Sequence, residues 1–160
     1  MPAQVQPAPV ETPRVRPHSV LFACTLNTVR SPMAEALARH YFGREIYFAS
    51  AGLKRGEPDG FAMAAMEEIG IDISDARPKS VELFLAQPFH YVITVCGQAE
   101  ASCPAFHGAV RRRLHFPFDD PAAARGAEEQ VLEAFRRVRD QLRAYLAEFA
   151  RKESANRHFF

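Results

Sequence analysis

A cysteine followed after five residues by an arginine and a serine is the arrangement in this sequence that could carry out chemistry. The three residues are Cys24, Arg30 and Ser31, and the segment between them is Thr25, Leu26, Asn27, Thr28 and Val29. Backbone N–H groups of a tight loop that runs into a helix N-terminus form a concave anion site. The Arg30 guanidinium can bind two oxygens of a tetrahedral oxyanion. We therefore expect the loop from Thr25 to Arg30 to bind an oxyanion.

The thiol of Cys24 would face the centre of that ion. The positive field of the loop favours the thiolate at neutral pH, and the Ser31 hydroxyl could hydrogen-bond to it. This predicts a nucleophilic sulfur aimed at the central atom of a phosphate-like ion. The alternative is a buried cysteine at a strand end with an arginine nearby by chance. The apolar strand before the loop and the Ser-Pro pair after it favour the functional interpretation.

Two carboxylates further along the chain are candidates for a general acid. An acid is needed to protonate the leaving oxygen when the sulfur attacks. Asp119 and Asp120 directly precede Pro121. Aspartate before proline is also common in ordinary turns, so this pattern is weak without the cysteine loop.

Two further cysteines, Cys96 and Cys103, lie seven residues apart. If Cys24 attacks an oxyanion whose central atom can be reduced, a second thiol must attack the adduct. A third thiol can then resolve the resulting disulfide and carry the oxidation to the surface. The segment between Cys96 and Cys103 must rearrange for the two to meet. The alternative is that one cysteine packs in the core and the other is incidental.

The elements that must position these residues alternate between strands and helices. Short apolar runs predict strands over Ser19–Ala23, Ile46–Ser50 and His90–Val95, with a weaker strand over Arg113–Phe116. Helices are expected over Pro32–Phe42, Gly60–Ile69 and Ser80–Ala86. Ser31 is the expected N-cap and Pro32 the expected first position of the first of these helices.

The last helix has one apolar stripe, formed by Val131, Phe135, Val138, Leu142, Tyr145 and Phe149. Alternating strands and helices predict an α/β fold, a parallel sheet with helices on both faces. Ligands of such folds bind beyond the carboxyl ends of the strands, and Cys24 and Cys96 both lie at such ends.

Length and composition place these elements in one domain. The chain has 160 residues, and 20 basic against 19 acidic side chains give a net charge of +1. No clustered basic excess indicates a nucleic-acid or membrane-surface protein, and no apolar run reaches the roughly 20 residues that span a bilayer. Three cysteines are too few for a disulfide scaffold, so free thiols in a reducing cytoplasm are expected.

Both ends of the chain are expected to lie outside the packed domain. Five of the 12 prolines fall within the first 17 residues, which predicts a disordered arm over 1–17. A catalytic domain is then expected over 18–153, with a frayed tail over 154–160.

Several other features carry less weight. His90, His107 and His115 lack a metal-ligand spacing, and the second and third cysteines do not form a CxxC pair, so a zinc site is not expected. The basic run Arg111–Arg113 is typical of a solvated face. It could also concentrate anions near the site or meet an acidic partner surface.

The segment VLFACTLNTVRSPMAEAL resembles the opening of the low-molecular-weight protein tyrosine phosphatases and of the arsenate reductases that share their fold. The resemblance implies a three-layer α/β sandwich around a four-stranded parallel sheet. It assigns Cys24 as the nucleophile, Arg30 as the oxyanion clamp, Ser31 as the thiolate stabiliser and Asp120 as the acid. Asn27 matches the residue that braces the loop. The family usually has glycine where this chain has Leu26, and many members have a second cysteine where Val29 stands.

The spacing of the remaining cysteines is similar to that of the thioredoxin-coupled arsenate reductases. In that family three cysteines act in sequence, and Cys24, Cys96 and Cys103 fall at matching places. Phosphatases also tend to carry aromatic residues after their Asp-Pro, whereas alanines follow here, Ala122 first among them. The resemblance implies reduction of arsenate through a three-thiol relay, with a thioredoxin-like protein as reductant.

Two other functions remain open, and the partners depend on them. A phosphatase would hydrolyse phosphate monoesters through a cysteinyl phosphate, and a non-catalytic protein could use the loop to sense an oxyanion. Some reductases of this type bind potassium through positions that match Asn27, Glu35, Ser50 and Asp72, which separate structural roles would equally explain. No tightly bound cofactor is expected, and no nucleic-acid or membrane partner. The protein is expected to be a monomer.

Overall fold

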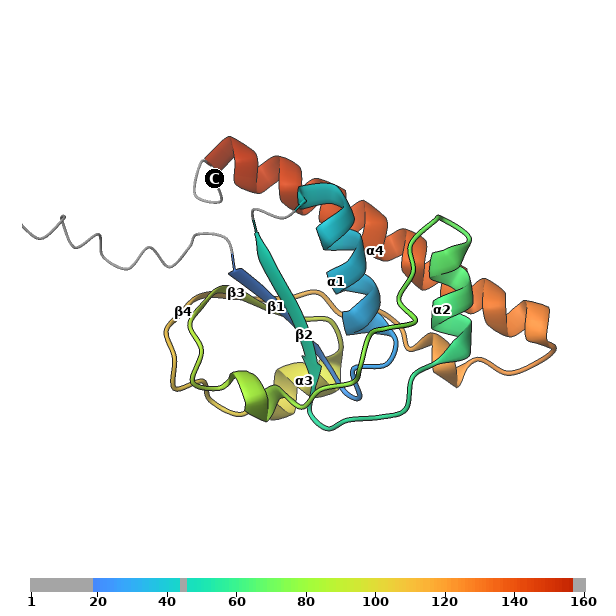
Figure 1. Cartoon of the computed structure of the whole chain (residues 1–160), viewed down its shortest axis with the longest axis horizontal. Coiled ribbons are helices and arrows are strands. Elements are labelled where there is room, and N and C mark those ends of the chain that lie inside the picture. The colour runs from blue at the N-terminus through green and yellow to red at the C-terminus, as the bar shows by residue number, and fades with distance from the viewer. Residues whose placement is uncertain (1–18, 44–45, 157–160) are drawn as a thin grey trace, which may run out of the picture.

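The computed structural model describes residues 19–43 and 46–156, and it contains a four-stranded sheet. The strands are β1 (Ser19–Cys24), β2 (Tyr47–Gly52), β3 (Phe89–Thr94) and β4 (Val110–His115). Their order is β2-β1-β3-β4 and every neighbouring pair is parallel. The predicted α/β fold with a four-stranded parallel sheet is confirmed (Figure 1). The arm expected over 1–17 lies outside the described residues.

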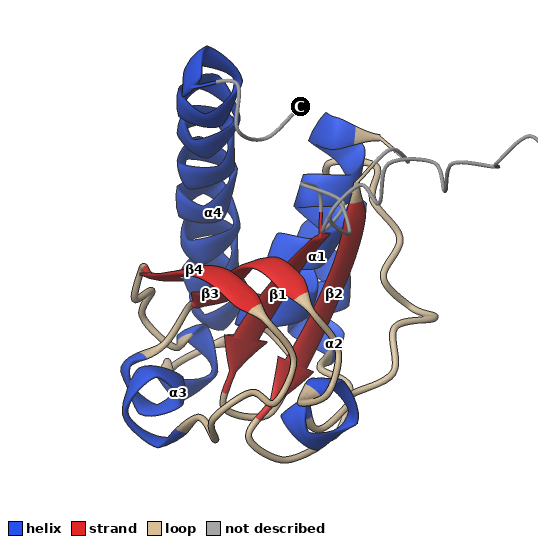
Figure 2. Cartoon of the chain, turned by 90° about the vertical axis from the view of Figure 1, so that its left-hand side faces the viewer, coloured by secondary structure: helices blue, strands red, loops and turns tan. Residues whose placement is uncertain are grey.

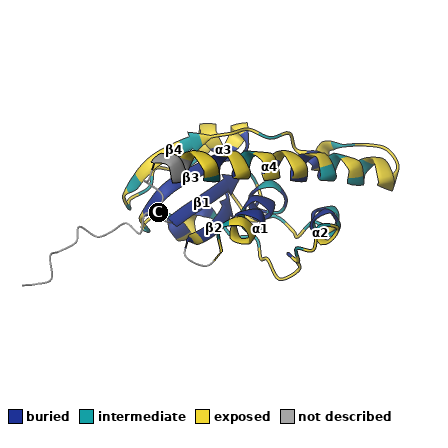
Figure 3. Cartoon of the chain, turned by 90° about the horizontal axis from the view of Figure 1, so that it is seen from above, coloured by how far each residue is buried: buried dark blue, intermediate teal, exposed yellow. Residues whose placement is uncertain are grey.

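One face of the sheet is covered by three helices. These are α1 (Arg30–Phe42), α2 (Gly60–Glu67) and α4 (Glu128–Asn156), and α1 contacts β1, β2 and α4 while α2 packs against α4. Burial of Phe135, Leu142 and Phe149 along α4 follows the predicted apolar stripe. Figure 3 shows the exposed outer side of α4 above the buried strands. The larger hydrophobic core therefore lies between this helical layer and the sheet.

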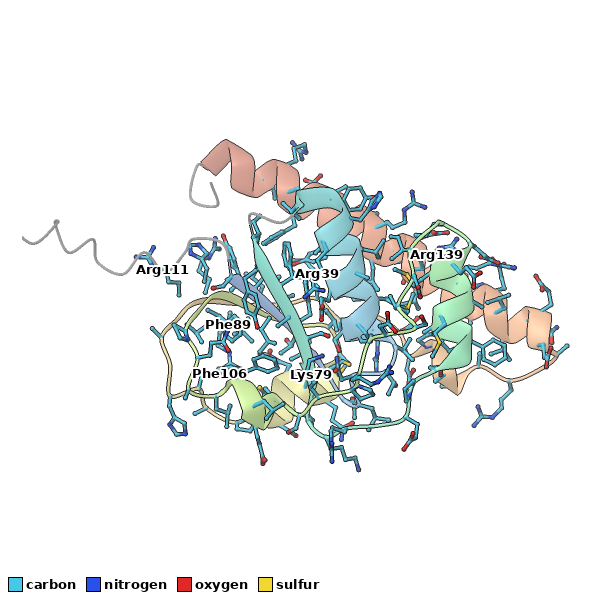
Figure 4. All side chains as sticks on the ribbon, viewed as in Figure 1. Arg39, Lys79, Phe89, Phe106, Arg111 and Arg139 are labelled. Atoms are coloured by element: carbon cyan, nitrogen blue, oxygen red, sulfur yellow. The ribbon has the colours of Figure 1, made fainter. Side chains whose placement is uncertain are left out.

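The other face has a thinner cover. The 3₁₀ helix η1 (Val81–Phe84) packs Val81 and Phe84 against buried residues of β1, β2 and β3. Phe106, from the segment before β4, adds an edge-to-face contact with Phe89, and both are labelled in Figure 4. These two layers and the sheet make the expected three-layer sandwich.

The carboxyl ends of the strands lie in register at one end of the molecule. Cys24 pairs with Gly52, and Thr94 pairs with Ala23 on one side and His115 on the other. The helix α3 (Gly97–Ser102) follows β3 here and contacts β1 and β3 (Figure 2). Residues placed after β1 and β3 are thereby brought to one edge of the sheet.

Several predicted boundaries were wrong. The helix α1 begins at Arg30 rather than Pro32, and Ser31 is not its N-cap because its hydroxyl contacts the Cys24 sulfur. The edge strand β4 begins at Val110, three residues early, because its exposed arginines hide the strand pattern. The predicted helix over 80–86 is a shorter 3₁₀ helix. The helix α4 continues to Asn156, and the rest of the tail expected over 154–160 lies outside the described residues. No helix among the described residues is long and apolar enough to cross a membrane.

Candidate active site

The loop between β1 and α1 is held from outside by the segment that follows β2. Leu53 N donates to Cys24 O at 3.0 Å, Lys54 N to Thr25 O at 3.2 Å, and a third bond joins Gly56 N to Leu26 O at 2.9 Å. These bonds take up three carbonyl oxygens of the loop on its outer side. The loop curves tightly as a result, which is the geometry expected of an anion-binding concavity.

Asn27 pins the middle of this loop. It is the one non-glycine residue with a positive φ, 58°, among the described residues. Its side-chain amide donates to Ser31 Oγ at 2.8 Å and to Ser50 Oγ at 2.9 Å, and its oxygen accepts from Lys79 N at 2.8 Å. The bracing role implied for Asn27 is consistent with this geometry, because three elements hold one buried side chain.

The sulfur of Cys24 lies at the base of the loop and is almost fully buried. Ser31 Oγ is 2.7 Å away, and Asn27 N donates to the sulfur at 3.3 Å. Ser31 Oγ accepts from the Asn27 amide, and its own proton can go to the Cys24 sulfur at 2.7 Å or to Ala51 O at 3.4 Å, of which the sulfur is the nearer. The hydroxyl and the backbone N–H thus both lie within hydrogen-bond distance of the Cys24 sulfur.

Arg30, at the end of the loop, lies beside Asp120. Arg30 Nη1 donates to Phe118 O at 3.0 Å, and Arg30 Nη2 lies 3.8 Å from Asp120 Oδ2. Asp120 N-caps the short 3₁₀ helix η2 (Pro121–Ala123) by accepting from Ala122 N, and its side chain is 47% exposed. A half-exposed carboxylate beside the guanidinium can exchange protons with solvent.

These groups line one cavity of about 270 Å³. Its walls are Cys24, Thr25, Leu26, Thr28, Val29, Arg30, Cys96, Gly97, Gln98, Asp120 and Ala122. No side chain caps the N-terminus of α1, so its first N–H groups remain available to an anion. The cavity therefore combines a thiol, a guanidinium, a carboxylate and a helix N-terminus. Asp119 does not line it.

Cys96 joins this cavity from β3 and α3. Its sulfur lies 3.2 Å from Thr25 Oγ1 and accepts from Ala99 N at 3.4 Å, as the N-cap of α3. Thr25 directly follows Cys24 in the chain, so the two thiols reach the same cavity from neighbouring strands.

Cys103 does not line this cavity. It ends α3 and packs, half-buried, against the smaller core cluster on the far face of the sheet, whereas Cys96 belongs to the larger cluster. Burial raises the pKa of the Cys103 thiol, and the nearby Arg113 partly opposes that effect. The three cysteines are free thiols, and the structure brings only Cys24 and Cys96 of the three to the cavity.

The two departures from the family pattern fit the loop. Leu26 does not have a positive φ, so the absence of glycine there costs no backbone strain. Its side chain is 38% exposed and lies on the cavity rim. Val29 is buried in the larger core cluster, where an apolar side chain is stabilising.

The four residues matched to a potassium site are only partly together. Ser50 Oγ donates to Glu35 Oε1 at 2.6 Å and accepts from Asn27, so these three form a hydrogen-bonded chain. Asp72 accepts from Ser74 N and shares a second cavity, of about 520 Å³, with Glu35.

Arg39 already neutralises the carboxylate of that chain. Arg39 Nη2 lies 2.8 Å from Glu35 Oε2 and donates to Phe48 O at 2.9 Å, between α1 and β2 (Figure 4). The Asn27 oxygen likewise accepts from Lys79 N. A potassium ion at these residues stays a prediction.

Sequence reasoning missed three supports of the site. Lys79 acts through its backbone N–H, which no sequence pattern reports. Gly52 lies so close to the loop that a Cβ would come 2.7 Å from Asn27 N, and its position just after the predicted strand over 46–50 was the one available signal. Thr94 is buried at the end of β3 and hydrogen-bonds to groups on α3 and β4.

The remaining candidates stay away from the cavity. The described residues contain no cluster of three or more metal-ligating side chains, so His90, His107 and His115 form no such group. Arg111–Arg113 are exposed on the edge strand β4 and do not line the cavity. Arg112 lies over the Tyr91 ring, 5.8 Å from its centroid.

Comparison with known sequences gives two matching results. The model of the low molecular weight phosphotyrosine protein phosphatase family matches residues 19–158. Curated arsenate reductases from Shouchella clausii and from Bacillus subtilis are each 40% identical over 131 residues, which cover 82% of this chain and 94% of each relative.

Solved structures agree with the sequence comparison. An arsenate reductase in the phosphate binding state superimposes with a TM-score of 0.72 at 32% identity, covering 84% of this chain and 98% of that one. A low molecular weight protein tyrosine phosphatase from T. tengcongensis gives a TM-score of 0.66 at 26% identity, covering 84% and 99%. The chain therefore belongs to the low molecular weight phosphotyrosine protein phosphatase family.

Proposed function

We propose that this protein is an arsenate reductase that uses Cys24, Cys96 and Cys103 in sequence. The observation that carries the proposal is the presence of two thiols, Cys24 and Cys96, in one cavity with Arg30 and Asp120. Hydrolysis of a phosphate ester needs one thiol, whereas reduction needs a second thiol within reach of the first. The 40% identity to curated arsenate reductases supports the same conclusion.

The first step is attack of the Cys24 thiolate on arsenate. The Arg30 guanidinium and the loop N–H groups hold the oxygens of the ion, and they stabilise the charge that develops on them. A sulfur–arsenic bond forms as an arsenic–oxygen bond breaks. Asp120 gives its proton to the departing oxygen, which leaves as water.

The second step transfers two electrons to arsenic. The Cys96 thiolate attacks the Cys24 sulfur, a Cys24–Cys96 disulfide forms, and the sulfur–arsenic bond breaks. The bonding electron pair stays on arsenic, which falls from the pentavalent to the trivalent state and leaves as arsenite. The Ala99 N–H donates to the Cys96 sulfur at 3.4 Å and holds that sulfur at the cavity.

The third step moves the oxidation away from the cavity. The Cys103 thiolate attacks the Cys96 sulfur, and Cys24 leaves as a thiolate ready for another turnover. A Cys96–Cys103 disulfide remains, which a dithiol protein of the thioredoxin type reduces. Because Cys103 packs on the far face of the sheet, α3 must rearrange before this step. The protein acts as a monomer in the reducing cytoplasm.

The test is arsenate-dependent oxidation of NADPH in the presence of thioredoxin and thioredoxin reductase. Wild type should turn over continuously, Cys96→Ser should release no arsenite, and Cys103→Ser should complete at most one turnover. Ser102→Ala, an exposed change in the same helix, should behave as wild type. Sustained thioredoxin-dependent turnover by Cys103→Ser would rule out the relay.

Phosphate monoester hydrolysis is the second candidate, because the same cavity holds every group that this reaction needs. Cys24 would form a cysteinyl phosphate, Arg30 would bind its oxygens, and Asp120 would protonate the leaving alcohol. Hydrolysis of a phosphoester that depends on Cys24 and is unchanged by Cys96→Ser, without arsenate turnover, would establish this function instead.

A further inference from the structure

A buried threonine connects the helix α3, which lies between Cys96 and Cys103, to the ends of β3 and β4. Thr94, the last residue of β3, is 1% exposed and stands two residues before Cys96. Its hydroxyl donates to Glu100 Oε2 at 2.8 Å, from the middle of α3. The same hydroxyl lies 2.8 Å from His115 Nδ1, at the end of β4.

The three side chains form one directed chain. The Thr94 proton has Glu100 Oε2 at 2.8 Å as a nearer acceptor than Leu114 O at 3.4 Å. With the proton on that bond, the Thr94 oxygen accepts from His115 in the tautomer that carries its proton on Nδ1, and the His115 ring and the Glu100 carboxylate approach to 3.8 Å. A carboxylate that accepts from a buried hydroxyl makes a stronger bond than a neutral acceptor would. The helix α3 has six residues, too few to be stable without such contacts.

This contact controls where the Cys96 sulfur points. With α3 in place, Ala99 N donates to that sulfur and Ala99 itself is fully buried. The sulfur then faces the cavity while Cys103, at the other end of α3, packs on the far face of the sheet. Formation of a Cys96–Cys103 bond requires α3 to leave this position, which breaks the contacts of Glu100.

We propose that Thr94, Glu100 and His115 form a latch that holds Cys96 toward Cys24 and delays its pairing with Cys103. Glu100 is thus a positioning residue, and its role rests on the relay proposed above. The Glu100 carboxylate also contributes to the raised pKa of the Cys103 thiol, against the effect of Arg113. Release of the latch therefore frees Cys96 to meet Cys103.

The first experiment isolates the latch from arsenate chemistry. In a Cys24→Ser background, the reduced full-length protein is mixed with oxidised glutathione, which accepts the two electrons. Formation of the Cys96–Cys103 disulfide is followed by mass after alkylation. Glu100→Gln and Thr94→Val should form the disulfide about tenfold faster, the effect expected when a hydrogen bond to a charged acceptor is weakened or lost. Thr94→Ser keeps the hydroxyl and Ser102→Ala leaves the latch intact, so both should match the parent.

The second experiment uses the complete enzyme. In a single turnover with arsenate and no reductant, Glu100→Gln should release arsenite several-fold more slowly. The arsenate concentration that gives half of the maximal single-turnover rate should stay unchanged, because the loop and Arg30 are intact. A change that merely loosened the fold would not speed one step and slow another. Equal disulfide rates in Glu100→Gln and Ser102→Ala would overturn the latch and leave the relay standing. If no variant forms the disulfide, both proposals are wrong.

Discussion

At the scale of single residues, the site depends on the hydrogen bonds that hold Ser31 beside the nucleophile. The Asn27 amide donates to Ser31 Oγ and to Ser50 Oγ, and the Cys24 sulfur, at 2.7 Å, is a nearer acceptor for the Ser31 hydroxyl than Ala51 O at 3.4 Å. The two aspartates that follow Phe118 differ in where their side chains lie. Asp120 lines the cavity and lies near Arg30, whereas Asp119 is exposed and does not line it.

That difference predicts opposite outcomes for two neighbouring substitutions. Asp120→Asn should lower kcat for arsenate by about 10²–10⁴-fold, the usual contribution of a positioned acid. Asp119→Asn removes the same charge from the same loop and should change kcat less than about twofold. Steady-state arsenite production by both variants tests this. Equal losses would mean that the charge of the loop matters rather than a proton donor.

Arg39 makes a second prediction at this scale. Because its guanidinium pairs with Glu35, the wild-type melting temperature should be the same in potassium and in tetramethylammonium chloride at equal ionic strength. Arg39→Gln removes the ion-pair partner of Glu35 and should melt about 1–3 °C lower, the small effect of a pair whose arginine is exposed. Potassium should restore part of that loss. A wild type that melts higher in potassium would show that the cation binds despite Arg39.

At the scale of elements, the strands and the final helix could be predicted because their burial repeats regularly along the chain. All six residues of β1 are buried, and α4 buries one stripe. The sequence could not predict the order of the strands or the side of the sheet on which Cys103 lies. Short segments such as α3 contain too few residues for a periodic pattern. The start of α1 was misplaced because the Ser31 hydroxyl serves the thiol and not the helix end.

The packing of the β2 end against the loop predicts a strong effect from one methyl group. A Cβ on Gly52 would lie 2.6 Å from Lys54 O and 2.7 Å from Asn27 N, both backbone atoms that cannot swing aside. Gly52→Ala should lower the melting temperature by several degrees, from about 1–3 kcal/mol of overpacking, and should weaken phosphate binding. Gly60→Ala is the control, because nothing lies within 4 Å of a Cβ there. Phosphate affinity that survives Gly52→Ala would show that the loop can shift without loss of its shape.

The helices α2 and α4 are joined by an ion-pair group that makes stability depend on pH. Glu68 bonds to Arg136 and Arg139, and these hydrogen bonds lower its pKa from an ordinary 4.5 to about 2. A carboxyl whose pKa is lowered by folding stabilises the fold above pH 4.5, and that stabilisation is lost as the pH falls from there toward about 2. The difference in melting temperature between wild type and Glu68→Gln should therefore be largest above pH 5 and should shrink toward pH 2.

Glu67→Gln is the matched control for this pH dependence. Glu67 is exposed on the same helix, and the same charge is removed there. Its substitution should leave the melting curve nearly parallel to wild type at every pH. A Glu68→Gln difference that stays constant from pH 6 to pH 2 would mean that the two arginines do not act through the Glu68 charge.

At the scale of the whole molecule, every group assigned to the chemistry lies between β1 and η2. The strand β1 is central, with β2 on one side and β3 on the other, so the sheet needs the chain from Ser19 onward. Ser19 already contributes, because its hydroxyl accepts from His90 N at 3.0 Å. The family match also begins at residue 19.

A shortened chain that begins at residue 18 should therefore keep both the melting temperature and the arsenate turnover of the full chain. The composition of residues 1–17, with five of the 12 prolines, offers little apolar surface to bury against the domain. A chain that begins at residue 21 is the control. It lacks Ser19 and the fully buried Val20, and it should melt several degrees lower because a core side chain and a hydrogen bond are lost. If the chain that begins at residue 18 already turns over more slowly than the full chain, the proline-rich segment takes part in catalysis or in binding the reductant. A binding assay with oxidised thioredoxin distinguishes the two.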